Sequence, residues 1–428
     1  MKIVQSGVAC GKLMMSKTRR FCTEHRGFTL LWGCYAVALA IIYAVLPITY
    51  EANWLYFFRY LFRNGALPYI QCRVGYPPIG FLTYMPFAWL AGCNLTLFAF
   101  CQRAINGALL LSSMLLMYIV IDRVWGRRDA VLASAVFVAS ASTFRMNMVS
   151  NDVIALFFTL LALYFMLMKR SILAGMNIGF ATMVKGFPAL LFIPALKWFK
   201  DEKSVLRLAG AFFMTIYFIS LPFLVLDPFM YVSTFVHHWT RGPWETVWAL
   251  LDGWQSHGGF LHPDFDQFFY HFQLLRIYPL LRNDHAFYAW RYPDIPIALT
   301  ICQFAIVAIS YLLIGKKFDE NSLLRDVGLI FLGYMLFFKG YSPQFTVFLL
   351  PMMLISLKGL WKVCLCVPLE ISTILQLLAW GSEGWFTYDY HMPILVSGVI
   401  IRTATLIAAV GLLSFQLLKI SKMEAGFQ

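Results

Sequence analysis

The sequence predicts an all-α membrane protein that crosses the bilayer many times. Of its 428 residues, 60% are hydrophobic and only 13% are charged, whereas roughly 25% of the residues of a typical soluble domain are charged. Apolar runs recur along the chain, and a run of roughly 20 such residues is long enough to cross the hydrocarbon core of a bilayer. The first run begins near Phe28 and is long enough to remain as a helix, so we expect no cleavable signal peptide.

The apolar runs predict about twelve transmembrane or re-entrant helices, some of them too short to span alone. We place them at about 28–48, 95–121, 130–145, 153–168, 172–184, 186–199, 205–226, 294–314, 323–338, 343–357, 363–380 and 393–418. They form one unit over residues 28–418, between a tail of residues 1–27 and a tail of residues 419–428. Two long connections, about 49–94 and 227–293, do not span.

Basic residues gather in alternate connections between these helices. Segments such as DRVWGRRD at 122–129 and IGKKFDE at 314–320 carry much of the net charge of +13. Since connections rich in Lys and Arg stay in the cytoplasm, we expect both termini to be cytoplasmic and both long connections to lie outside. No basic face interleaved with aromatic residues is found, so we expect no nucleic-acid partner.

The first outer connection combines a helix with a rigid turn. Residues 53–65, NWLYFFRYLFRNG, place apolar side chains at helical spacing, and Gly65 ends the pattern. This predicts an amphipathic helix in the membrane interface. Tyr76 is followed by Pro77 and Pro78, and proline fixes its own φ and restricts the residue before it. We therefore expect a stiff corner that returns the chain to the bilayer.

The ordered set of motifs resembles the GT-C glycosyltransferases, and among them family 87, the polyprenyl-phosphate-sugar-dependent mannosyltransferases and their relatives. The set consists of an acid after the first helix (Glu51), the aromatic helix, GALPY at 65–69, Tyr-Pro-Pro at 76–78, SNDVIALFFTLLALY at 150–164, LAGMNIGFATMVKGFPALLFIPAL at 173–196, RGPWETVWALLDG at 241–253 and YSPQFTVFLLP at 341–351. It extends over nearly the whole chain.

The resemblance implies the GT-C fold and a glycosyl transfer at the outer face of the membrane. It implies a hexose, mannose above others, that moves from a polyprenyl phosphate to a lipid-linked or glycan acceptor with inversion of the anomeric carbon. The expected location is the cell membrane, or the endoplasmic reticulum membrane in a eukaryote. No nucleotide-binding or dinucleotide-binding glycine motif is present, so we expect no cofactor.

Two acids are candidates for the general base that takes a proton from the acceptor hydroxyl. Glu51 is the acid of the first outer connection, about where the family commonly has Asp. Its alternative role is that of a solvated carboxylate at a helix end. Asp152 follows Ser150 and Asn151, and all three residue types are also natural at a helix N-terminus. We expect Glu51 to be the base and Asp152 to be a cap or a supporting polar group.

Cations near the outer ends of helices are candidates for binding the donor phosphate. Lys185 interrupts an apolar run, where an ionisable group is costly unless it faces a cavity or a partner. Its alternative role is a lysine that extends to the interface. Lys339, beside the YSPQF motif, is a further candidate for the same reason. Arg241 is a phosphate candidate within HHWTRGPWE, although it could instead form a plain i,i+4 pair with Glu245.

The remaining substrate contacts are expected from aromatic and polar residues of the same motifs. They are His237, His238, Glu245, Tyr76 and Gln344. Asp264 and Asp266 form an Asp-x-Asp pair of the kind that holds a metal with a nucleotide sugar, but on the outer side we interpret them as solvated acids and expect no metal.

A transporter or a flippase for lipid-linked sugars is the alternative function. It would use the charges that lie within apolar stretches, at Arg103, Glu370 and Arg402, as a polar groove. Transporters often contain inverted repeats, and we find no internal repeat.

Overall fold

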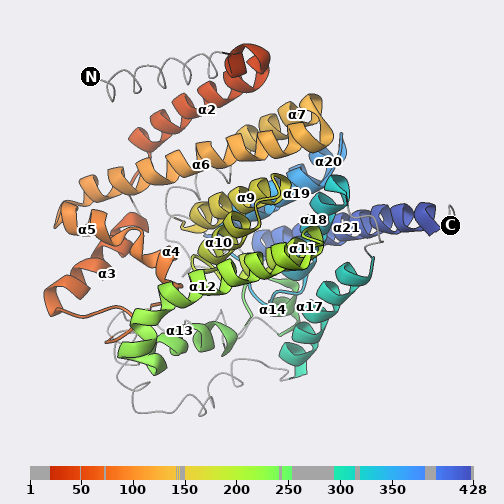
Figure 1. The fold of residues 1–428 in the computed structure, drawn as a ribbon. Helices are drawn as coiled ribbons and strands as arrows, with labels where there is room; N and C mark the ends of the chain where they lie inside the picture. Colours follow the sequence, from red (N-terminus) through yellow and green to blue (C-terminus); the bar gives the residue numbers. More distant parts are fainter. Residues whose placement is uncertain are drawn as a thin grey trace, which may run out of the picture.

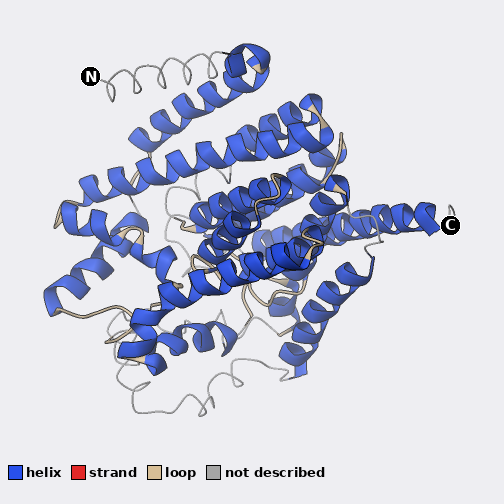
Figure 2. Ribbon diagram, viewed as in Figure 1, coloured by secondary structure: helices blue, strands red, loops and turns tan. Residues whose placement is uncertain are grey.

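The protein is a bundle of α-helices in the computed structural model (Figures 1 and 2). The structure describes residues 20–48, 50–71, 74–140, 142, 144, 150–240, 243–252, 294–313, 319–380 and 392–425. Within these ranges no strand occurs, and an isolated parallel bridge joins Trp244 and Gly340. The expected all-α class is confirmed for this part of the chain.

The helices follow the apolar runs closely. They are α2 (Arg26–Val45), α3 (Tyr50–Asn64), α4 (Pro78–Leu82), α5 (Met85–Ala91), α6 (Leu95–Trp125), α7 (Arg127–Ala139), α9 (Asp152–Leu167), α10 (Ser171–Thr182), η2 (Phe187–Leu191), α11 (Phe192–Trp198), α12 (Glu202–Leu226), α13 (Pro228–Thr240), α14 (Val247–Leu251), α17 (Asp294–Leu313), α18 (Glu320–Leu336), η4 (Pro343–Phe345), α19 (Thr346–Ser356), α20 (Trp361–Trp380) and α21 (Met392–Ala425).

Five of the described helices are long and apolar enough to cross a membrane alone. They are α2, α6, α12, α20 and α21. Other apolar helices, such as α9 and α10, have 10–17 residues, and at about 1.5 Å per residue they reach only part of the way across a bilayer core of about 30 Å. The number of independent spans found is therefore smaller than the twelve helices expected.

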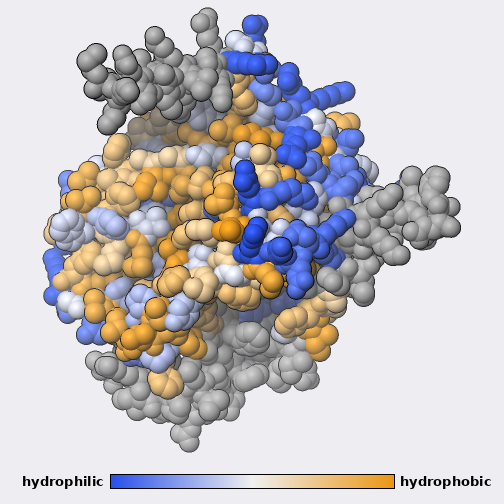
Figure 3. Space-filling view, viewed as in Figure 1, coloured by the Kyte–Doolittle hydropathy of each residue, from blue (hydrophilic) through white to orange (hydrophobic). Residues whose placement is uncertain are grey.

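The basic connections meet at one end of the bundle. Arg123 at the end of α6 forms an ion pair of 2.6 Å with Glu320 at the start of α18. The backbone N–H of Gly359, between α19 and α20, donates to Asp129 of α7 at 2.7 Å. Hydrophilic side chains cover this side of the surface in Figure 3, while most of the rest of that face is apolar. We call this the basic end.

The opposite end, which we call the loop end, holds the connections that carry the sequence motifs. Helix α3 ends at Asn64 as the pattern predicts, because Gly65 adopts φ +58°, a conformation that glycine reaches at no steric cost. The two short helices α4 and α5 follow the Tyr-Pro-Pro turn and were not expected. Most of the second long connection, 253–293, lies outside the described residues.

Candidate active site

The Tyr-Pro-Pro segment contacts the end of α10 directly. The backbone N–H groups of Ile79 and Gly80 both donate to the carbonyl of Met183, at 2.9 and 3.3 Å. Asn151 donates from its side chain to the carbonyl of Gly80 at 3.2 Å. A Cβ at Gly80 would lie 2.6 Å from the carbonyl oxygen of Val184, so only glycine allows this approach. The stiff turn joins the start of α9 to the end of α10.

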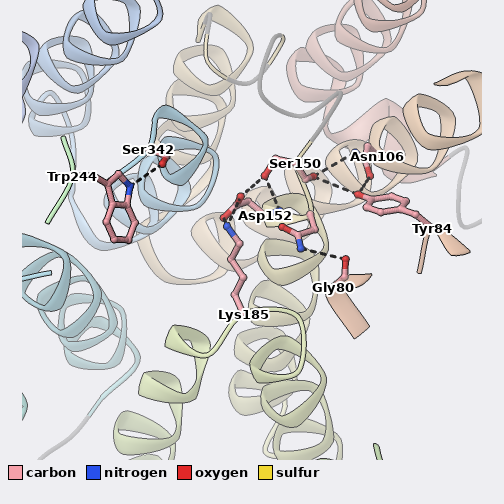
Figure 4. Close-up of polar contacts among 9 residues, drawn as sticks. Gly80, Tyr84, Asn106, Ser150, Asp152, Lys185, Trp244 and Ser342 are labelled. Carbon is pink, nitrogen blue, oxygen red and sulfur yellow. Dashed lines mark hydrogen bonds and ion pairs between the residues drawn. The ribbon is translucent and has the colours of Figure 1, made fainter. Parts of the chain in front are cut away.

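Asp152 and Lys185 form a buried ion pair at this junction (Figure 4). The ammonium Nζ of Lys185 donates to both carboxylate oxygens of Asp152 at 2.7 Å. The side chains are 8% and 0% exposed. The Ser150 hydroxyl also donates to this carboxylate and accepts from the N–H of Asp152 at 3.0 Å. Lys185 therefore does not extend to solvent, and Asp152 does more than begin a helix.

The segment before Asp152 is fixed by α5 and α6. The Tyr84 hydroxyl donates to Oδ1 of Asn106 at 2.8 Å, and the Asn106 amide donates to the carbonyl of Ser150 at 3.4 Å. All three residues are buried, and Figure 4 shows them beside the ion pair. A buried hydrogen-bond network of this kind specifies one arrangement. It determines where Asp152 begins α9.

Aromatic rings border the ammonium group of Lys185. Nζ lies 4.6 Å from the ring centroid of Phe345 and 5.8 Å from that of Tyr76. The Tyr76 ring packs against Trp54 of α3, with centroids 5.5 Å apart. The structure thus brings the expected substrate residue Tyr76 to Lys185. Gln344, next to Phe345, is partly exposed.

A second loop joins the motif RGPWETVW to the motif YSPQF. The N–H of Trp244 donates to the carbonyl of Lys339 at 3.3 Å, and the N–H of Tyr341 donates to the carbonyl of Trp244 at 3.0 Å. The Trp244 indole N–H donates to the hydroxyl of Ser342 at 3.1 Å (Figure 4). A Cβ at Gly340 would overlap the Trp244 ring. These contacts place Lys339 and Glu245 on neighbouring segments of the chain.

Glu245 is buried and does not lie in a helix. It adopts φ +48° between the bridge at Trp244 and the start of α14. The interpretation of Arg241 and Glu245 as an i,i+4 helix pair is therefore wrong. The side chain of Glu245 accepts from Gln376 at 3.3 Å, and its carbonyl accepts from Arg402. The sequence indicates Arg402 only as a charge for a transporter, and Gln376 carries no charge that would indicate it.

Glu51 forms a second buried ion pair within the described part of the loop end. Nε of Arg103 lies 2.6 Å from Oε1 of Glu51, and the two side chains are 6% and 1% exposed. Arg103 also donates to backbone carbonyls at the end of α2, to Tyr43 at 2.5 Å and to Pro47 at 3.0 Å. Glu51 is therefore not a solvated carboxylate. Its role as the general base stays a prediction.

Several of the expected site residues lie outside the described part of the chain. Arg241, Asp264 and Asp266 lie in segments that the structure does not describe. His237 and His238 belong to α13, but the structure does not describe their side chains. Among the described residues, no group of three His, Cys, Asp or Glu side chains could hold a metal ion.

The part of the sequence that matches a known family includes the contact between the Tyr-Pro-Pro turn, Asp152 and Lys185. Residues 75–264 match glycosyltransferase family 87. The match confirms the resemblance that the motifs carry and indicates a glycosyltransferase. It includes Tyr76, Asp152, Lys185 and Glu245, whereas Glu51 precedes it and the C-terminal helices follow it. No curated protein matches the chain.

Proposed function

We propose that this membrane glycosyltransferase moves a hexose, mannose by resemblance, from a polyprenyl phosphate to a lipid-linked or glycan acceptor on the outer face. The acceptor hydroxyl loses its proton to a carboxylate, its oxygen attacks the anomeric carbon, and the phosphate leaves with the bonding electrons. The observation that carries the proposal is the buried Asp152–Lys185 pair inside the family match, bordered by Tyr76 and Phe345.

Lys185 supplies the charge for the leaving phosphate in this proposal. An ammonium has three N–H donors, and the bonds to Asp152 use two of them. Burial lowers the pKa of Lys185, and Asp152 opposes this effect and orients the ammonium group. Lys339 and Arg241 are the further cations proposed for the phosphate. Such preorganised charge is typically the largest contribution to catalysis.

Glu51 remains our candidate for the general base. Trp54, one turn along α3 from Glu51, packs on both Tyr76 and Tyr84, with ring centroids 5.5 and 5.7 Å apart. These contacts link the first ion pair to the Asp152 site. The contact that Arg103 makes with Oε1 holds this carboxylate in place.

The depth of the site supports an outer-face reaction. Helix α9 begins at Asp152 and has 16 residues, so Asp152 lies about 24 Å from the basic end at about 1.5 Å per residue. If the basic end is cytoplasmic, the site lies near the outer boundary of a core of about 30 Å. A donor with a lipid tail in the bilayer would reach it from the side.

The deciding experiment is the transfer of a labelled hexose in reconstituted vesicles. We expect the purified full chain to move radiolabelled mannose from mannosyl-phosphoryl-polyprenol to a lipid or glycan product, and Lys185→Met to abolish this transfer. If the chain instead carries the intact labelled lipid across the bilayer without forming a product, the flippase function replaces the proposal.

A cysteine-accessibility experiment tests the orientation. A single cysteine at Gly126 should react with an impermeant reagent only from the cytoplasmic side, and one near residue 262 only from outside. Reaction of both from the same side would contradict the outer-face site.

A further inference from the structure

Two buried polar atoms beside Glu245 have no hydrogen-bond partner within the described part of the chain. They are Nη1 of Arg402 and Oε1 of Gln376. The two residues are 2% and 0% exposed, and they lie on the apolar helices α21 and α20. A buried unpaired polar atom is costly, above all inside a membrane. Two such atoms, on side chains that both contact Glu245, point to a bonding partner outside the described part of the chain.

The packing of α20 and α21 holds these side chains together. A Cβ at Gly398 would lie 3.0 Å from the carbonyl of Ser372 and 3.2 Å from Cγ of Gln376. Gly398 is one turn before Arg402, so the close contact of the helices brings both side chains toward the same loop. Both then reach the same loop residue, Glu245, through its carbonyl and its carboxylate.

Glu245 is held in a strained conformation that directs it inward. Its φ of +48° is unfavourable for a residue with a Cβ. The conformation is maintained by the bridge at Trp244 and by the Thr246 hydroxyl, which donates to the carbonyl of Lys339 at 2.9 Å. Strain of this kind persists when the surroundings fix it, and it gathers at functional sites. The result is a carboxylate that is 1% exposed.

The chemistry of the cluster favours hydroxyl groups over a phosphate. Arg402 offers a donor, Gln376 offers an acceptor, and Glu245 adds an acidic acceptor. A phosphate at neutral pH accepts hydrogen bonds and would be repelled by the carboxylate. A sugar hydroxyl both donates and accepts, and the Tyr341 ring, 3.7 Å below the Arg402 guanidinium, adds an aromatic surface.

We propose that Glu245, Gln376 and Arg402 form a subsite for neighbouring hydroxyl groups of a hexose ring. This inference rests on the proposed function. It assigns the hexose ring of the substrate to side chains of α20 and α21 and to Glu245. The subsite adjoins the Lys185 site, because the Phe345 ring lies 5.6 Å from the Tyr341 ring and 4.6 Å from Nζ of Lys185. Phosphate and sugar are thereby bound by separate groups.

The test compares two lipids that differ only in the sugar. We would measure the binding of mannosyl-phosphoryl-polyprenol and of bare polyprenyl phosphate to the full chain in detergent. The wild type should prefer the lipid that carries the sugar. Gln376→Met and Arg402→Lys should reduce this preference about tenfold, as the loss of one or two hydrogen bonds predicts, and leave the affinity for the bare lipid unchanged. Lys185→Met should weaken both lipids.

A second arm identifies a ring that belongs to the acceptor. If the subsite binds the acceptor, the wild type and the variants show the same preference between the two lipids. Methyl α-mannoside then binds the wild type at millimolar concentration and binds Gln376→Met about tenfold more weakly. Thr405→Val is the matched control, because Thr405 also lies buried on α21 but donates within its own helix, to Ile401. Melting temperatures identify any variant that does not fold.

The outcomes separate the two proposals. The subsite is contradicted if the wild type neither prefers the sugar-bearing lipid nor binds methyl α-mannoside, or if a folded Gln376→Met variant retains both properties. The proposed function fails separately, when no hexose is transferred although the sugar-bearing lipid binds.

Discussion

The two buried ion pairs of the loop end differ in what surrounds the cation. Arg103 contacts Glu51 and also donates to the carbonyls of Tyr43, Leu46 and Pro47, so most of its five N–H groups are used. Lys185 contacts Asp152 and otherwise faces aromatic rings. The first cation is held by the end of a helix, whereas the second retains bonding capacity.

This difference teaches that burial alone does not identify a catalytic charge. Arg103 supplies the donors that the free carbonyls at the end of α2 require, and Glu51 neutralises it. Lys185 satisfies no backbone carbonyl in the described contacts, and its position beside Tyr76 has no comparable structural explanation. The predictions below separate charges that maintain the fold from charges that act on a substrate.

The largest effect is expected at the second pair. Lys185→Met leaves Asp152 buried and unpaired, which typically costs about 3–5 kcal/mol of stability. The double variant Asp152→Asn/Lys185→Met removes both charges and should recover most of that stability. We expect it to melt near the wild-type temperature and to transfer hexose at least about 100-fold more slowly. Thermal unfolding and initial transfer rates measure the two effects.

The same double variant has an outcome that would assign the pair to the fold alone. That outcome is a folded protein with wild-type transfer, which would remove the phosphate-binding role of Lys185. Arg241 and Lys339 would then be the cations left to examine.

The next effect is expected at the first pair. Glu51→Gln keeps the shape of the side chain but cannot take a proton, so transfer should fall roughly 100-fold if Glu51 is the base. Glu51→Asp should retain measurable activity. Donor binding should stay nearly constant in both variants, because we propose that other groups hold the phosphate. Transfer rates at saturating donor and donor affinities provide the comparison.

A structural role for Glu51 predicts a different pattern. In that case Glu51→Gln lowers the melting temperature. The transfer activity of Glu51→Gln and of the double variant Glu51→Gln/Arg103→Gln then rises and falls with the melting temperature of each variant. A folded and active Glu51→Gln enzyme would move the base elsewhere, first to Asp152 and then to His237.

The sequence predicted the helices better than it predicted the site. The extent of α3 followed from the aromatic spacing and Gly65, because both act within one turn. Lys185 was indicated because a charge in an apolar run is costly. Its partner Asp152 is 33 residues away, however, and an N-cap pattern explained that acid equally well. Gln376 gave no signal, since its role depends on the contact of two helices with a distant loop.

A smaller effect is expected where the turn contacts the second pair. Gly80→Ala places a Cβ 2.6 Å from the carbonyl of Val184 and 2.8 Å from the Asn151 amide, so the segment that carries Lys185 must shift. Overpacking of this kind costs about 1–3 kcal/mol, and we expect transfer to fall about tenfold, since small misplacements near a reacting centre are expensive. Gly210→Ala is the control, because a Cβ there meets no atom within 4 Å. Equal activity of the two variants would show that the turn does not position Lys185.

The smallest effect is expected at an ion pair of the basic end. Arg123 and Glu320 are 2.6 Å apart, but their side chains are 42% and 33% exposed. Exposed pairs contribute about 0.2–1 kcal/mol and weaken with salt. Glu320→Gln should therefore change the melting temperature by only a few degrees and leave hexose transfer at the wild-type rate. A large loss of transfer in a folded Glu320→Gln variant would mean that the basic end takes part in catalysis, and the distinction between the two ends would have to be abandoned.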